Sequence, residues 1–348
     1  MADRRAVLKG AGLVTSLRGV YSAPLVGNQN VAVRSFRPIS VLVADHAEWP
    51  DLESPLGDLQ GSELPRPDAP YPTHFDPAGD PIYRERLRTA SPPDSYNGPT
   101  FDVRHIGVGD HGRIKISCGL GRYFVSLATS EALDDELMKA LERDPNQPVT
   151  LMNLPRRAWL HQRVADPVRD GRFRSAAVSI ATVSLVAREK GLYRLLLATR
   201  SRRVATHPSF NHVIPAGIFS PFEVGDPREA YSVTKGFLSE YLEELYSYPD
   251  LSQRPLALEA EPPIQRLREM LEDDRANLLY TGISVNLLTL RPEICLLLLV
   301  HDAGWLKREQ AADRPMSLNW ENVKSGRVTP CVRSSTSRTP PASSARPR

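Results

Sequence analysis

The chain has 348 residues, a formal net charge of +3 and an apolar content of 41%, which is enough for two domains with their own cores. So small a charge argues against a protein built around a nucleic-acid groove, since such a protein carries a basic stripe within its folded part. No run approaches the roughly 18 apolar residues of a membrane-spanning helix, and the three widely separated cysteines offer neither a zinc spacing nor a disulfide framework.

Residues 1–35 form a leader whose structure the sequence leaves open. The paired Arg4 and Arg5 resemble the start of a twin-arginine export signal. The apolar stretch that follows them ends at Arg18, however, and is shorter than a working signal requires. We therefore expect a cytoplasmic protein without a membrane segment, and export through this leader is the alternative.

Residues 36–160 are predicted to form a smaller α+β region with a proline-rich loop. Residues 39–46 have the composition of a short strand, and residues 100–120 alternate apolar and polar side chains as a β-hairpin does. Eleven prolines lie within residues 50–99. They exclude regular helix or central strand there, because proline lacks the amide donor. Ser130 is a good N-cap for the helix that we expect to follow it.

Residues 170–310 give a clearer pattern. The expected elements, in chain order, are two strands around a turn at 188–191, a short strand leading into a glycine loop near 217, helices over 228–247 and 261–274, and a hairpin over 281–302. The returning strand of that hairpin is apolar enough to be buried on both faces. This order predicts an α+β fold in which helices pack on a mixed β-sheet.

Residues 326–348 contain five arginines, four prolines and no acidic residue. Such a composition cannot bury a core, so we predict a disordered basic tail. This tail is also the one segment through which we would expect nucleic acid or an anionic surface to be bound.

The strongest chemical signal is a group of three acids. Glu240, Glu243 and Glu244 are spaced i, i+3 and i+4, so their side chains converge on one patch of the predicted helix. Three neighbouring carboxylates repel one another unless a cation lies among them, and Mg²⁺ or Mn²⁺ prefers such oxygen ligands. The alternative is an ordinary solvated face opposite Leu242 and Leu245, since glutamate is a good helix former.

The residues around this helix resemble the signature of the Nudix hydrolases. The positions that carry the resemblance are Gly217, Glu223, Glu240, Glu243 and Glu244, with an apolar residue after the first helical acid. The resemblance covers roughly residues 174–305, and it implies a Nudix-like fold for the second region only.

Enzymes of this family hydrolyse nucleoside diphosphates linked to another moiety, with a divalent metal. The resemblance implies Mg²⁺ or Mn²⁺ bound by Glu240, Glu243, Glu244 and the carbonyl of Gly217, and a nucleotide-like small molecule as the substrate. Glu243 or Glu244 is then the general base, and Glu293 is a second candidate because it precedes a long apolar strand. Candidate substrate ligands are Arg200, Arg202 and Glu223.

The sequence also departs from the family pattern. The gap before Glu240 is about eight residues too long, Ser239 stands where the family has arginine, and Tyr246 or Ser247 stands where it has glycine. These departures support an alternative function, a non-catalytic Nudix-like sensor or regulator that binds nucleotides. Domains of this family often pair, which leaves a homodimer open.

Overall fold

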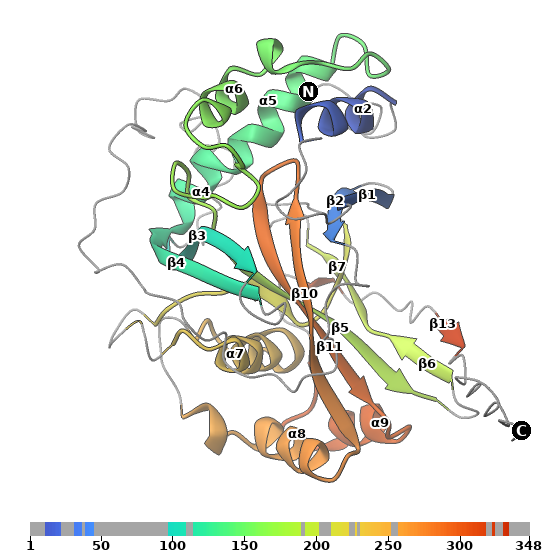
Figure 1. Ribbon diagram of the computed structural model, residues 1–348. Helices are drawn as coiled ribbons and strands as arrows, with labels where there is room; N and C mark the ends of the chain where they lie inside the picture. The colour runs from blue at the N-terminus through green and yellow to red at the C-terminus, as the bar shows by residue number, and fades with distance from the viewer. Residues whose placement is uncertain are drawn as a thin grey trace, which may run out of the picture.

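Figure 1 shows the computed structural model of the chain. The structure describes residues 11–21, 31–36, 39–44, 97–108, 114–188, 192–201, 210–222, 227, 230–251, 257–317, 322–323 and 330–333. Most of the proline-rich stretch lies outside these ranges. Within them, no helix combines the length and the apolar character that crossing a membrane requires.

The centre of the molecule is a mixed β-sheet. Its strands, in spatial order, are β1 (Val31–Phe36), β2 (Ile39–Ala44), β10 (Ala276–Asn286), β11 (Arg291–Val300), β5 (Ser179–Ala187), β6 (Leu192–Leu195) and β13 (Pro330–Arg333), and β9 (Ala216–Ile218) also pairs with β5. The pairing of β11 with β5 is parallel, and the other pairings in this sheet are antiparallel. The predicted α+β fold with a mixed sheet is therefore confirmed.

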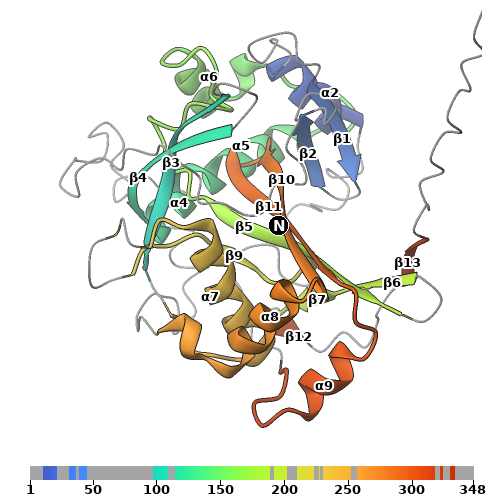
Figure 2. The ribbon, with the colours of Figure 1, turned by 60° about the horizontal axis from the view of Figure 1, so that its bottom comes forward.

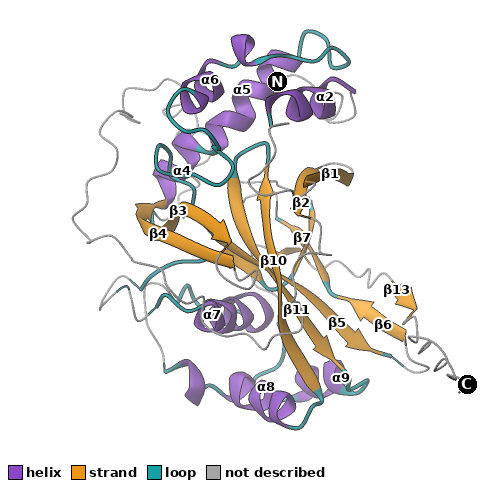
Figure 3. Cartoon of the chain, viewed as in Figure 1, coloured by secondary structure: helices purple, strands orange, loops and turns teal. Residues whose placement is uncertain are grey.

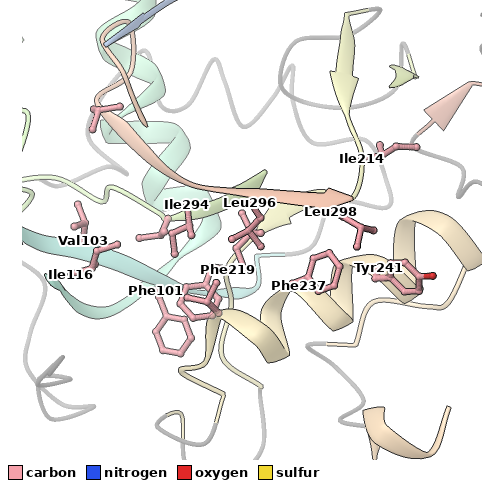
Figure 4. Close-up of a cluster of buried hydrophobic side chains, with 14 of the residues drawn as sticks. Phe101, Val103, Ile116, Ile214, Phe219, Phe237, Tyr241, Ile294, Leu296 and Leu298 are labelled. Atoms are coloured by element: carbon pink, nitrogen blue, oxygen red, sulfur yellow. The ribbon is translucent and has the colours of Figure 1, made fainter. Parts of the chain in front are cut away.

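Helices lie at both ends of this sheet and beside its middle (Figure 3). At one end lie α8 (Pro262–Glu272) and α9 (Trp305–Ala311), and α7 (Val233–Tyr246) lies beside the middle of the strands; α7 and α8 match the predicted helices. Side chains of α7 pack on alternate residues of β11, among which Leu296 and Leu298 are no more than 1% exposed (Figure 4).

The other end is built by the N-terminal half of the chain. Its elements are α2 (Ala11–Val20), the hairpin of β3 (Pro99–Val108) and β4 (Ile114–Arg122), then α4 (Tyr123–Thr129), α5 (Glu131–Leu141), η3 (Leu151–Asn153) and α6 (Pro155–His161). The predicted hairpin and helix are confirmed. Helix α2 lies within the predicted leader, and it buries Leu13 and Leu17 in the core.

The two halves share backbone hydrogen bonds and one apolar core. Phe101 N–H donates to the carbonyl of Phe219 at 3.2 Å, and Val103 N–H donates to that of Ala176 at 2.9 Å. One continuous cluster of buried residues runs from α2 through the hairpin and sheet to α9. The boundary that we placed between residues 160 and 170 stays a prediction.

Two local predictions were wrong. Ser130 does not cap α5, because its backbone is already helical and its hydroxyl donates instead to the carbonyl of Ser175 at 2.6 Å. Strand β11 is not buried on both faces, since its residues alternate between buried and partly exposed.

The strand expected before the glycine loop and part of the C-terminal tail also differ from the prediction. That strand is broken by the cis peptide bond Ile214–Pro215 into β8 (Asn211–Val213) and β9. Strand β8 joins β7 (Leu197–Arg200) and β12 (Asn322–Val323) in a second, 3-stranded sheet. Within the tail, β13 pairs with β6, so its four residues are a strand where disorder was predicted.

Candidate functional site

Helix α7 presents the three glutamates, and local sequence determines where it begins and ends. The Ser232 hydroxyl accepts a hydrogen bond from Lys235 N–H at 3.3 Å and caps the first turn. Ser247 ends the helix in the left-handed conformation, with φ 54°, so it occupies the place that glycine takes in the resembled family. The stripe that packs on the sheet is the predicted one: Phe237, Leu238, Tyr241, Leu242 and Leu245 are all buried.

Gly217 lies directly beneath Glu240. A β-carbon built on Gly217 would stand 2.0 Å from Oε1 and 2.1 Å from Oε2 of Glu240. Such distances are far below van der Waals contact, so the carboxylate of Glu240 fills the space that a side chain would need at this position. Glycine at this position therefore permits the close approach of Glu240, and its backbone conformation is not an unusual one.

Glu244 reaches the same strand from the next helical turn. Its Oε2 accepts a hydrogen bond from Ala216 N–H at 2.9 Å, and the residue is only 3% exposed. The i, i+4 spacing of Glu240 and Glu244 thus brings two carboxylates to Gly217 and Ala216, consecutive residues of β9. We call these four residues the α7–β9 corner.

Glu243 contacts the chain that follows α7. Its Oε1 accepts a hydrogen bond from Leu251 N–H at 2.8 Å and ties down the chain that leaves α7. Within the described ranges, no three His, Cys, Asp or Glu side chains form a group that could hold a metal ion. A preformed set of all three glutamates is therefore not seen, and the assignment of metal ligands stays a prediction.

The C-terminal end of α7 is braced by residues far away in sequence. The hydroxyl of Tyr246 donates to Oε2 of Glu309 on α9 at 2.8 Å, and Arg266 of α8 binds both carboxylate oxygens of Glu309. Burial raises the pKa of Tyr246, and the neighbouring Tyr241 and Glu309 raise it further, so this phenol keeps its proton. Sequence reasoning missed this brace, because no local pattern links its partners.

Glu293, the second candidate for the base, does not lie beside the α7 glutamates. In the strand register, Glu293 pairs with Ser179, and the neighbouring Ile180 pairs with Gly217. Since Ile180 and Gly217 face α7 and successive strand residues point to opposite faces, the exposed Glu293 points away from the helix.

Arg200, Arg202 and Glu223 were the predicted substrate ligands. Arg200 lies at the end of β7, where its backbone N–H donates to the carbonyl of Phe210, seven residues before Gly217. Arg202 and Glu223 lie outside the described residues.

A second polar cluster lies inside the N-terminal half. Asp102 is fully buried and accepts hydrogen bonds from the hydroxyls of Thr100 at 2.7 Å and Ser175 at 2.6 Å. Burial raises the pKa of Asp102 to about 7. Burial also raises the pKa of nearby Cys118 to about 12, which favours the protonated thiol over the nucleophilic thiolate.

A guanidinium group holds the same half of the chain against the β10–β11 hairpin. Arg157 is 1% exposed. It donates to the carbonyls of Leu287 at 3.2 Å, Leu288 at 2.6 Å and Leu133 at 3.2 Å, and also to the hydroxyl of Tyr21. These contacts satisfy carbonyls of a buried turn, which indicates a structural role.

Comparison with known proteins adds no relative to this description. No protein-family model matches the chain, and no curated protein matches it either. The features that bear on function are therefore the geometry of the α7–β9 corner and the resemblance of its residues to the Nudix signature.

Proposed function

We propose that this chain is a Nudix-like protein that hydrolyses a nucleoside diphosphate linked to another moiety, with Mg²⁺ or Mn²⁺ bound at the α7–β9 corner. The observation that carries the proposal is the meeting of Glu240 and Glu244 with Gly217 and Ala216. The resemblance requires acids of one helix to face the glycine segment before it, and two of the three acids do so.

The donor set at this corner fits the proposed cation. Glu240 and Glu244 supply carboxylate oxygens, and the Gly217 carbonyl would be a third oxygen ligand. Mg²⁺ in phosphate-handling sites is commonly held by one or two carboxylates, with water and substrate oxygens completing its shell. When bound, the metal would neutralise charge on the diphosphate and lower the pKa of a coordinated water.

The chain's own residues then have distinct roles. Glu240 takes the space beside Gly217, so it is the ligand that the glycine makes room for. Between the two expected bases, Glu244 lies at this corner and Glu243 does not, and we therefore assign the orientation of the attacking water to Glu244. Glu243 positions the chain after the helix.

A second candidate function is a sensor that binds the metal and nucleotide without cleaving it. It is favoured by the hydrogen bond between Glu243 and Leu251, which removes one acid from the expected cluster. Ser239 in place of the family's arginine points in the same direction, because a side chain that would help to hold the acids is missing.

Calorimetric titration with Mg²⁺ and with Mn²⁺ tests the proposal on the full chain. We expect binding by the wild type and a loss of about tenfold or more in Glu240→Gln and Glu244→Gln, because each removes a charged ligand. Glu272→Gln, which changes an exposed acid at the end of α8, is the matched control and should bind like the wild type.

Turnover separates the two candidates. The protein is incubated with ADP-ribose and with nucleotide sugars in the presence of metal, and release of nucleoside monophosphate is followed by chromatography. Release that disappears in Glu244→Gln supports the hydrolase, and metal binding without release supports the sensor. If neither metal binds the wild type, the acids only hold α7 against its neighbouring backbone, and both candidates fail.

A further inference from the structure

The sheet has two faces, and among the residues that the structure describes only one of these faces packs into the core. On β11, Ile294, Leu296 and Leu298 are no more than 1% exposed and face α7. In Figures 1 and 2, α7 and α8 lie together on this side of β10 and β11. The residues between these positions point the other way.

Those alternate residues form a second apolar surface, which we call the outward face. It consists of Leu279 on β10, Leu297 and Leu299 on β11, Val183 and Leu185 on β5, and Leu195 on β6. The register makes them neighbours, since Leu297 pairs with both Leu279 and Val183, and Leu185 pairs with both Leu299 and Leu195.

The outward face is not part of the apolar core that the described residues form. None of its six side chains belongs to the core cluster or to the residues that pack against that cluster. Val183 is 37% exposed, although its strand, β5, lies inside the sheet between β11 and β6. Contiguous large apolar side chains on an accessible sheet face mark an interaction surface.

The two ends of the outward face differ in chemistry. At one end lies the exposed carboxylate of Glu293. At the other end, the Tyr193 hydroxyl and Nδ1 of His301 are 2.7 Å apart, and Nε2 of His301 lies 2.7 Å from Oδ1 of Asn277. Leu297 lies midway between Glu293 and His301 along the chain.

We propose that the outward face is the interface of a homodimer in which two copies stack their sheets face to face with the strands antiparallel. This arrangement places each Glu293 opposite the hydroxyl, imidazole and amide groups of its partner. Stacking with the strands parallel would place the two Glu293 carboxylates opposite each other, which is unfavourable. The twofold axis then passes close to Leu297.

The area of the outward face limits how tightly two copies can associate. The area of the outward face follows from the spacing of strands, about 4.8 Å, and the rise of about 3.3 Å per residue. About nine residues on each of β10, β11 and β5, with the 4 residues of β6, give roughly 500 Å² per copy. The total of about 1,000 Å² lies at the lower limit for a specific interface. We therefore expect a reversible dimer whose population depends on protein concentration.

Sedimentation velocity over a hundredfold range of concentration measures this equilibrium. The wild type should pass from monomer to dimer, and Leu297→Lys should weaken self-association about tenfold or more by placing a charge at the centre of the interface. Met152→Lys is the control, since Met152 is 94% exposed on η3, outside the face. A wild type that stays monomeric throughout, or an equal effect of both variants, would overturn the proposal.

Thiol cross-linking tests the arrangement itself. In a chain with Cys295→Ala and Cys331→Ala, a short bismaleimide should link Leu297→Cys to a second copy of itself. Glu293→Cys should not link to itself but should link to His301→Cys in a mixture of the two chains. Efficient self-linking of Glu293→Cys would show the parallel arrangement and contradict the one proposed here.

Discussion

The N-terminal half and the α7–β9 corner use charged side chains in opposite ways. In the N-terminal half, Arg157 and Asp102 are buried, and their polar atoms bond to groups of the fold. At the corner, Glu240 and Glu244 meet backbone atoms at a glycine that leaves no room for a side chain. The first pattern is that of groups that hold elements together, and the second places two acids where we propose that a metal ion binds.

Replacement of Arg157 by methionine should have the largest effect on stability. It leaves the buried turn carbonyls of Leu287 and Leu288 without this donor and removes the contact with Leu133 of α5, and we expect a loss of roughly 5 kcal/mol in the free energy of unfolding. Urea denaturation measures it. Arg163→Met, which removes an exposed guanidinium stacked on Trp159, should cost about 1 kcal/mol or less. Similar losses of stability in both variants would show that the buried contacts of Arg157 do not hold the two halves together.

The buried Asp102 should make stability depend on pH. Its pKa is raised from 3.8 to about 7 in the folded protein, so the native state keeps a proton that the unfolded chain has already released. Stability should then fall as pH rises from about 4 to about 7, by on the order of 4 kcal/mol, and stay level above that. Thermal unfolding of wild type and Asp102→Asn across this range measures the effect. The variant should lose most of the slope, and an unchanged slope would show that another group is responsible.

Two glycines near the α7–β9 corner, Gly236 and Gly217, give further tests of this comparison. A β-carbon on Gly236 would stand 2.6 Å from Cδ1 of Ile180 and 2.9 Å from the ring of Phe219, both in the packed core. Gly236→Ala should therefore destabilise the protein by about 1–2 kcal/mol, even though alanine favours the helix. Chemical denaturation is the measurement, and a stabilising effect would mean that α7 can move away from β5.

Gly217→Ala should behave differently, because the atom in its way is the end of a flexible side chain. Glu240 can swing aside, so stability should change by no more than about 0.5 kcal/mol. Displacing that carboxylate should weaken Mg²⁺ binding about tenfold, as measured by the same calorimetric titration. Unchanged metal affinity in a stable variant would separate Glu240 from the metal site.

Much of the second region could be predicted from periodic patterns. The stripe of α7 and the apolar runs of the β10–β11 hairpin are local signals, and both elements formed close to where they were expected, although β11 alternates where burial on both faces was predicted. The facing of Glu240 and Glu244 toward Gly217 also follows from helical spacing combined with the motif. Such features depend on residues close together in the chain.

The errors share a cause in contacts that are distant in sequence. Ser130 looked like a cap because its alternative partner, Ser175, is 45 residues away. Oε1 of Glu243 accepts a hydrogen bond from Leu251 N–H, and the spacing of the three acids does not reveal this contact. The face to which Glu293 points depends on its register with β5, and a single strand does not reveal that register.

The β10–β11 hairpin spans both halves of the molecule, and this has a consequence for dissecting the protein. Its turn carries Leu287, Leu288 and Leu290, each no more than 1% exposed. Arg157 of the N-terminal half and Arg174 at the start of the second region both hold that turn. A fragment that begins at residue 170 would retain Arg174 but lose Arg157, and it would present three leucines to water. Fragments chosen by motif boundaries alone would therefore be prone to aggregate, and the corner should be studied in the full chain.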